Sequence, residues 1–230
     1  MQAFILKIIY SGIIRNFLKL IVGVKFDKAD FLLKEKQFII VANHNSHMDT
    51  MALMASLPSS IVHKVKPVAA ADYFGKTKMK AFFSNYFINA ILISRQGGNP
   101  IHTMKKALED GYSLIIFPEG SRGEPDSEQQ MKPGVAMLLS LCSGVKYVPA
   151  YLYGMGKIMP KGDGLIVPFS STLVYGKPTL PNSENVKEIL TQIENDMNEL
   201  KSKESRSIGY LLSQTQVNII PPPASNTPNN

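Results

Sequence analysis

At the centre of the sequence pattern stands Val41-Ala42-Asn43-His44-Asn45-Ser46-His47-Met48-Asp49-Thr50. The segment follows an apolar, β-type run at 38–41 and precedes a helix-type run at 51–55. A histidine where a strand gives way to a helix, with an aspartate five positions later, is a candidate general base with its orienting acid. His44 and Asp49 are therefore the first candidate catalytic residues.

From residue 36 to 176, short β-rich runs alternate with helix-like segments. This alternation predicts a single α/β domain with a mostly parallel central sheet flanked by helices. The predicted strands are 38–42, 67–70, 89–94, 114–117 and 146–152, with a looser one within 165–175. The predicted helices are 48–57, 76–87, 100–110 and 132–142, followed by a polar helix at 184–204. We expect the domain to cover 27–212, with a disordered tail at 213–230 because that segment is poor in apolar residues.

Residues 1–26 are strongly apolar, and Lys7, Ser11, Arg15 and Lys19 recur every four positions. On a helix these side chains form one stripe opposite an apolar face. The segment has no convincing cleavage site, which argues against a signal peptide. A spanning helix would place Arg15 near the bilayer centre, at a cost of roughly 2.5–3.5 kcal/mol. An amphipathic helix lying in the membrane interface fits best, and a helix packed on the globule is the main alternative.

Net charge indicates the class of partner, and cysteine content indicates the redox compartment. The chain has 230 residues, and 25 Lys and Arg against 18 Asp and Glu give a net charge of +7. That excess favours an anionic partner such as a membrane surface or a phosphorylated substrate. Nucleic acid is not expected, because no stacking-aromatic motif or recognition helix is evident. The single cysteine excludes an internal disulfide, which is compatible with a reducing compartment.

Three predicted strands end in unusual polar residues. Strand 38–42 is followed by His44, strand 89–94 by Arg95, and strand 114–117 by Pro118-Glu119-Gly120-Ser121-Arg122-Gly123. Parallel strands bring their carboxyl ends to one edge of the sheet, where ligands of such folds bind. We therefore expect a base, two arginines and a glycine-rich turn to converge there.

The pairing of His44 with Asp49 sets a geometric condition. On a continuous helix, five positions turn the side chains about 140° apart. The two can meet only if His44 lies before the first helical turn. Alternatives are a capping stretch with an incidental histidine, or a metal triad that includes His47. No further Cys or His cluster supplies more metal ligands, so a metal is not expected.

The turn at 119–123 fits neither of two common motifs. A nucleophile elbow needs Gly two positions before the serine, where Glu119 stands. A phosphate loop ending at 75–77 would need its first Gly where Ala70 stands. What remains is a turn whose glycines let backbone amides approach a ligand, with Arg122 to pair with an anion. An ordinary glycine-rich loop is the alternative.

Taken in order, these motifs resemble the glycerolipid acyltransferase family of the lysophosphatidic acid acyltransferase type. Asn43-His44 with Asp49 is similar to its His-x-x-x-x-Asp block, and Phe117-Pro118-Glu119-Gly120-Ser121-Arg122 is similar to its third block. Ile91-Leu92-Ile93-Ser94-Arg95 and Val148-Pro149-Ala150 are similar to its second and fourth blocks. The resemblance covers residues 35–155. It departs from the family at Asn89 and Ser94, near the second block, and in the acidic stretch 124–130.

The resemblance implies an activity and a set of site residues. His44, oriented by Asp49, would be the general base for acyl transfer from an acyl-CoA or acyl-carrier protein to 1-acyl-sn-glycerol 3-phosphate, giving phosphatidic acid. The implied substrate-binding residues are Arg95, Glu119, Gly120, Ser121 and Arg122, with no metal or cofactor. The implied location is the cytoplasmic face of a membrane, reached through the N-terminal helix.

Two alternatives remain open at this point. The same chemistry could act on glycerol 3-phosphate, another lysophospholipid or an acylated amino acid. A non-enzymatic lipid-binding protein could share the fold, but it would have no need of a base beside its acid.

Overall fold

The computed structural model describes residues 2–27, 29–71, 89–94, 97–121, 129–158 and 167–217. Of residues 204–217 it describes the helical backbone alone.

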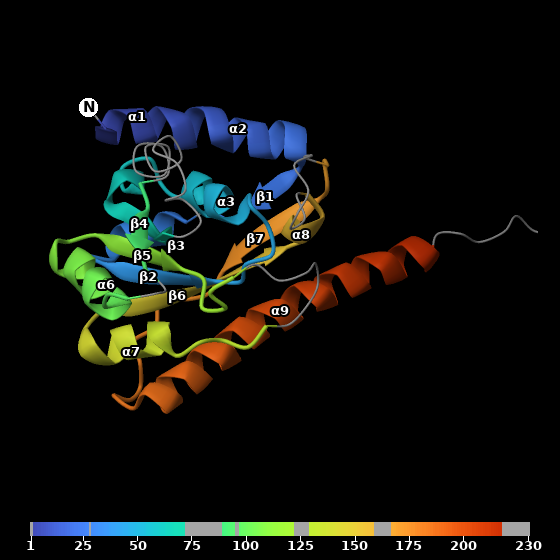
Figure 1. Ribbon diagram of the computed structural model, residues 1–230. Coiled ribbons are helices and arrows are strands. Elements are labelled where there is room, and N and C mark those ends of the chain that lie inside the picture. The colour runs from blue at the N-terminus through green and yellow to red at the C-terminus, as the bar shows by residue number, and fades with distance from the viewer. Residues whose placement is uncertain are drawn as a thin grey trace, which may run out of the picture.

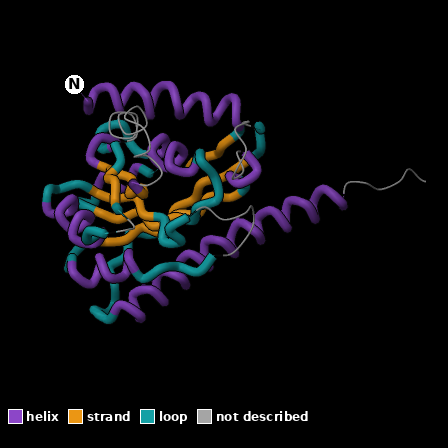
Figure 2. Tube along the Cα trace, in the orientation of Figure 1, coloured by secondary structure: helices purple, strands orange, loops and turns teal. Residues whose placement is uncertain are grey.

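A seven-stranded sheet forms the middle layer, in the order β1-β7-β6-β2-β5-β3-β4 (Figures 1 and 2). Strands β2 to β6 run parallel to one another, whereas β7 is antiparallel to β6 and parallel to β1. The expected mostly parallel sheet is therefore confirmed. The strands are β1 Val24–Phe26, β2 Phe38–Ala42, β3 Val65–Ala70, β4 Ile91–Ile93, β5 Ser113–Ile116, β6 Lys146–Tyr153 and β7 Ser171–Tyr175.

Helices cover both faces of the sheet, and each face has its own apolar core (Figure 1). The N-terminal helix and α3 Asp49–Ser56 lie over one face. Over the other lie α6 Pro100–Glu109, α7 Gly134–Leu141 and α9 Val186–Val217. Short helical segments at Asp30–Lys34, Val62–Lys64 and α8 Met155–Ile158 complete the described connections.

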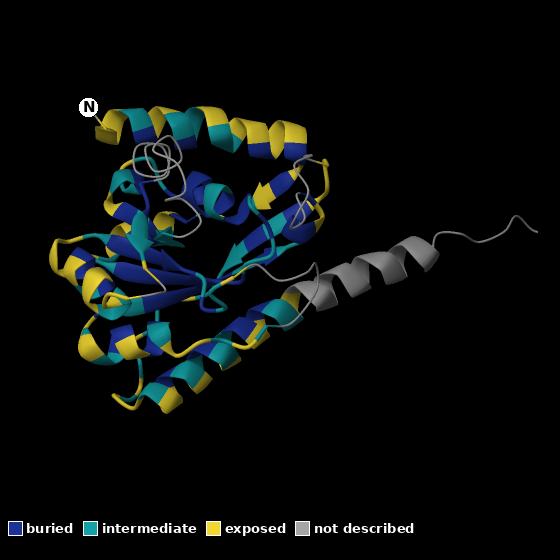
Figure 3. Ribbon diagram, in the orientation of Figure 1, coloured by how far each residue is buried: buried dark blue, intermediate teal, exposed yellow. Residues whose placement is uncertain are grey.

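Strand β2 occupies the centre of the sheet, between β5 and β6. All five of its residues are buried, because helices cover both of its faces (Figure 3). An uninterrupted apolar run suits such a strand, whereas a half-exposed strand would alternate polar and apolar residues. The segment after β2 therefore starts from a fully buried strand in the middle of the sheet.

Several predicted boundaries need correction. Strand β1 was missed, because a three-residue strand forms only through its distant pairing with β7. Strand β4 is shorter than the predicted 89–94, and Asn89 lies outside it with a left-handed φ of 57°. Helix α9 continues to Val217, since no proline interrupts the chain before Pro221. The predicted tail therefore cannot begin at 213. The predicted helix at 76–87 and residues 218–230 lie outside the described part.

The N-terminal helix combines α1 Gln2–Lys7, π-helical Ile8–Ile14, α2 Arg15–Phe17 and π-helical Leu18–Val22. It ends at Gly23, whose φ of 89° suits glycine, so the expected helical end at 26 is wrong. Its inner side buries Leu6, Tyr10, Leu18 and Val22 against the domain. No helix within the described ranges is long and apolar enough to cross a membrane.

The predicted polar stripe of this helix is not exposed along its whole length. Lys7 and Lys19 are exposed, but Arg15 turns toward α3. Its guanidinium donates to the Ala55 carbonyl at 2.6 Å and to the Leu57 carbonyl at 2.5 Å. Those carbonyls end α3, where backbone acceptors lack intrahelical partners. The arginine thus ties the N-terminal helix to the helix that begins at Asp49.

Candidate active site

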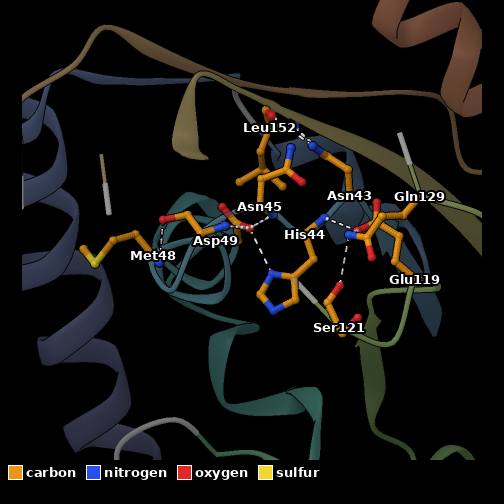
Figure 4. Close-up of polar contacts among 10 residues, drawn as sticks. Asn43, His44, Asn45, Met48, Asp49, Glu119, Ser121, Gln129 and Leu152 are labelled. Carbon is orange, nitrogen blue, oxygen red and sulfur yellow. Dashed lines mark hydrogen bonds and ion pairs between the residues drawn. The ribbon is translucent and has the colours of Figure 1, made fainter. Parts of the chain in front are cut away.

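His44 and Asp49 form a hydrogen-bonded pair beyond the carboxyl end of β2 (Figure 4). His44 Nδ1 lies 2.9 Å from Asp49 Oδ2. The contact is possible because α3 begins at Asp49, so that His44 precedes its first turn. The geometric condition predicted from the sequence is therefore met.

The Asp49 carboxylate is fixed by more than the histidine. Its side chain is 0% exposed, and Oδ2 also accepts the backbone N–H groups of Asn45 and Ser46, each at 2.8 Å. In the tautomer with Nδ1 protonated, the His44 Nδ1–H donates to Asp49 Oδ2, and Nε2 is the unprotonated nitrogen. The His44 side chain is 19% exposed, so the imidazole belongs to the edge of the domain, not to its core.

Asn43 holds the start of this segment against β6. Its side-chain Nδ2 donates to the Leu152 carbonyl at 3.0 Å, and its Oδ1 accepts the Leu152 N–H at 2.7 Å. The ladder between β2 and β6 ends with Ala42 opposite Ala150. The buried amide thus replaces the next backbone pair and fixes the residue before His44.

The neighbouring strand β5 supplies a wall and a carboxyl group. Val41 is paired with Ile116, so the residues after β5 lie beside those after β2. The Phe117 ring stacks on the His44 imidazole, with centroids 4.1 Å apart and planes 20° apart. Glu119 Oε2 accepts the His44 backbone N–H at 3.3 Å. The predicted convergence of the ends of these two strands is confirmed.

Glu119 is partly buried, and burial raises its pKa to about 7. The His44 backbone N–H opposes this rise, whereas the negative charge of Asp49 adds to it. Gln129 Nε2 donates to Glu119 Oε2 at 3.0 Å and to the Ser121 carbonyl at 3.3 Å. Gln129 therefore ties the segment before α7 to the turn at 119–121.

The turn itself depends on Gly120, whose φ is 74° and whose N–H donates to the Phe117 carbonyl at 3.1 Å. A surface hollow adjoins it. Its lining consists of Glu119, Ser121, Gln129, Gln130, Met131, Lys132 and Pro133. Of the predicted substrate-binding residues, Glu119 and Ser121 thus lie near His44 (Figure 4), and Gly120 stands between them in the chain.

The two predicted arginines, Arg95 and Arg122, lie outside the described residues, so their roles stay predictions. The strand before Arg95 is described, however. Strand β4 shares its carboxyl edge with β2, but β5 and β3 stand between them, which separates β4 from β2 by about 14 Å. No group of three His, Cys, Asp or Glu side chains in the described ranges is arranged to hold a metal ion.

The sequence did not single out Phe117, Gln129 or Lys132 as individual site residues. The sequence pattern indicated only that Phe117 is the last residue of an apolar strand. Gln129 stands in the stretch 124–130, whose only visible signal was its acidity. Phe117 contacts His44 across the sheet edge, and Gln129 folds back onto the Glu119 turn, and no local sequence pattern predicts either contact.

Comparison with known proteins agrees with this geometry. The profile of the Acyltransferase family matches residues 23–170. A "probable 1-acyl-sn-glycerol-3-phosphate acyltransferase" of Mycoplasma genitalium is 23% identical over 137 residues, which is 56% of this chain and 49% of that protein. The chloroplastic 1-acyl-sn-glycerol-3-phosphate acyltransferase LPAT1 of Arabidopsis thaliana is 36% identical over 72 residues, covering 31% of this chain and 20% of that protein. The chain thus spans half or less of the length of these relatives.

A solved structure shares the fold. The 1-acyl-sn-glycerophosphate acyltransferase PlsC from Thermotoga maritima superposes with a TM-score of 0.71 at 22% identity, covering 88% of this chain and 81% of that one. The family profile includes the strand β2, the His44–Asp49 pair and the Glu119 turn, and it spans well over half of the chain. The chain belongs to the Acyltransferase family.

Proposed function

We propose that this protein transfers an acyl group from a thioester to the free hydroxyl of 1-acyl-sn-glycerol 3-phosphate, giving phosphatidic acid. The donor would be an acyl-CoA or an acyl-carrier protein. The observation that carries the proposal is the 2.9 Å contact between His44 Nδ1 and Asp49 Oδ2. It is supported by the names of the relatives from Mycoplasma genitalium and Arabidopsis thaliana.

The proposed reaction begins with removal of a proton. His44 Nε2 takes the proton of the acceptor hydroxyl as its oxygen attacks the thioester carbonyl. The new C–O bond forms, the C–S bond breaks, and the proton passes from the imidazolium to the departing thiolate. Asp49 holds the imidazole in the correct tautomer and stabilises the imidazolium while it exists.

An anionic phosphate on the acceptor is consistent with the net positive charge of the chain. We place it at the turn formed by Glu119, Gly120 and Ser121, on the same loop that contacts the His44 backbone. Arg95 and Arg122 are proposed to pair with the phosphate, as bidentate donors do with anions. A neutral Glu119 would lessen repulsion of that phosphate, and its raised pKa of about 7 permits this form near neutrality.

We further propose that the protein binds the cytoplasmic face of a membrane through its N-terminal helix. Much of the outer side of this helix is exposed (Figure 3), and several of the exposed residues have large apolar side chains. They are Phe4, Ile8, Ile13, Phe17, Leu20 and Ile21. Exposed lysines at positions 7 and 19 accompany them. An apolar stripe with flanking lysines favours an anionic lipid surface, where the acceptor and product would also reside.

One experiment tests the activity and the acceptor together. The purified protein is given acyl-CoA or acyl-carrier protein with 1-acylglycerol 3-phosphate, glycerol 3-phosphate or another lysophospholipid in turn. The proposal expects release of free thiol and formation of phosphatidic acid with the first acceptor. Turnover with another acceptor alone would correct the substrate. Absence of turnover with every pair, in a folded protein, would refute acyl transfer.

A further inference from the structure

The geometry points to Lys132 as a phosphate-binding residue: its ammonium lies over the Gly120 turn and can hold a phosphate monoester there. This inference rests on the proposed function, because it names a side chain for the phosphorylated acceptor. Lys132 belongs to none of the four sequence motifs, and it stands twelve positions after Gly120.

Hydrogen bonds join the segment 129–132 to the turn. The Lys132 backbone N–H donates to the Pro118 carbonyl at 2.9 Å. Gln129 Nε2 donates to Glu119 Oε2 at 3.0 Å and to the Ser121 carbonyl at 3.3 Å. The backbone of Lys132 is therefore held against the loop that contacts His44.

The ammonium itself lies close to the backbone of Gly120. A methyl carbon built on Gly120 would be 2.9 Å from Lys132 Nζ and 3.3 Å from its Cδ. The lysine side chain thus occupies the space that any other residue at 120 would fill. Gly120 has a left-handed φ of 74°, which glycine adopts without strain, and its lack of a side chain makes room for the Lys132 ammonium.

The surroundings suit an anion. Lys132 lines the hollow together with Ser121, whose hydroxyl can donate a hydrogen bond, and with Glu119, whose raised pKa of about 7 permits a neutral form. Within the described ranges, no carboxylate forms an ion pair with Lys132, so its charge is not neutralised there. Helix α7 begins two residues later, without a side-chain cap on its first turn, and its free N–H groups add positive potential.

The acceptor's geometry makes this position useful. The phosphate and the reacting hydroxyl of a 1-acylglycerol 3-phosphate stand on adjacent glycerol carbons. A phosphate held beside Gly120 would therefore keep the hydroxyl near the neighbouring His44, on the same loop system. A compact, strongly hydrated ammonium is well suited to bind a phosphate dianion from one side.

Equilibrium binding to the full-length protein in detergent micelles tests the inference. The two probes are 1-acylglycerol 3-phosphate and the matching monoacylglycerol, which lacks the phosphate. Lys132→Met should raise the Kd of the phosphorylated probe about 10- to 100-fold, as for a lost hydrogen bond to a charged group. It should leave the Kd of the monoacylglycerol unchanged, and Lys132→Arg should restore most of the affinity. Lys106→Met, on an exposed lysine of α6, is the matched control.

The results separate this inference from the proposed function, because binding is measured without a thioester. Phosphate-selective loss of binding in Lys132→Met supports the inference even if the unaltered protein transfers no acyl group. If Lys132→Met left the Kd of the phosphorylated probe unchanged, or weakened binding of both probes equally, the inference would be overturned. Lys132 would then be an ordinary solvated lysine. Acyl transfer with an unchanged KM in Lys132→Met would likewise overturn it while leaving the proposed function intact.

Discussion

The side-chain amide of Asn43, the residue just before the candidate base His44, hydrogen-bonds to both the backbone N–H and the carbonyl of Leu152. This pairing continues the β2–β6 ladder with a side chain where the backbone turns away. It joins the centre of the sheet to His44. The position of the imidazole is thus set from three sides: by Asn43 along the chain, by Asp49 at Nδ1 and by the Phe117 ring on its face.

Replacing Asn43 tests this arrangement. Asn43→Ala leaves the buried N–H and carbonyl of Leu152 without the amide partner. We expect the free energy of unfolding to fall by about 1–3 kcal/mol. Turnover should fall as well, because the backbone before His44 is released. Denaturant unfolding and initial rates measure the two effects. Asn16→Ala, at an exposed position of the N-terminal helix, is the control. A variant at 43 with unaltered stability would contradict the clamp.

Asp49→Asn separates the charge of the acid from its packing. The amide oxygen can still accept the backbone N–H groups of Asn45 and Ser46, so the fold should persist. Without the charge, the imidazolium loses its stabilising partner, and the amide NH₂ group can select the wrong tautomer. We expect kcat to fall about 10²- to 10⁴-fold. Steady-state rates at saturating acceptor and donor provide the measurement. A kcat near that of the unaltered protein would mean that Asp49 serves structure alone.

Glu119 predicts a pH dependence of stability. Its pKa rises on folding from an ordinary 4.5 to about 7. Between these values the folded state keeps a proton that the unfolded state has released, so this group's contribution to stability declines as pH rises through the window. Glu119→Gln removes the titration. We expect its stability relative to the unaltered protein to increase from pH 5 to pH 8 in chemical denaturation.

Glu109→Gln, on an exposed carboxylate of α6, is the control for that comparison and should show no such trend. The same pH trend in both variants would assign the effect to overall charge and not to burial of Glu119.

The outer side of the N-terminal helix predicts vesicle binding. Leu20 and Ile21 are 80% and 60% exposed. Replacing both with serine should weaken association with anionic phospholipid vesicles about 10- to 100-fold, since each side chain would lose its apolar burial in lipid. Co-sedimentation with vesicles measures the change. The control replaces Met137 and Leu141, exposed apolar residues on α7 over the opposite face of the sheet. Equal loss in the two double variants would refute a specific role for the helix.

The sequence was sufficient where the pattern is local. The apolar run at 38–42 predicted β2 without error. The helix predicted at 100–110 corresponds to α6, which begins at Pro100, and Asn99 Oδ1 accepts the His102 N–H at 3.0 Å. The strand-to-helix change after β2 also predicted that His44 precedes the helix of Asp49. These features arise from residues within a few positions of one another.

Features that depend on distant pairing escaped. Strand β1 forms through β7, far along the chain, and Arg15 finds the carbonyl of Ala55 on another helix. The regular spacing of the polar stripe on the N-terminal helix does not show that Arg15, among its members, bonds to the rest of the protein. In the site, Phe117 contacts His44 because β2 and β5 lie side by side, and Gln129 folds back onto the turn that follows β5.

The rate of acyl transfer by His44→Ala tests the central claim most directly. The purified variant is compared with the unaltered protein and with His102→Ala, which changes an exposed histidine of α6. Thiol release is followed with 1-acylglycerol 3-phosphate as the acceptor, and unfolding curves confirm that each protein is folded. If His44 is the general base, its variant should be slower by at least about 10²-fold, whereas His102→Ala should be unaffected. Near-normal turnover in a folded His44→Ala protein would contradict the account.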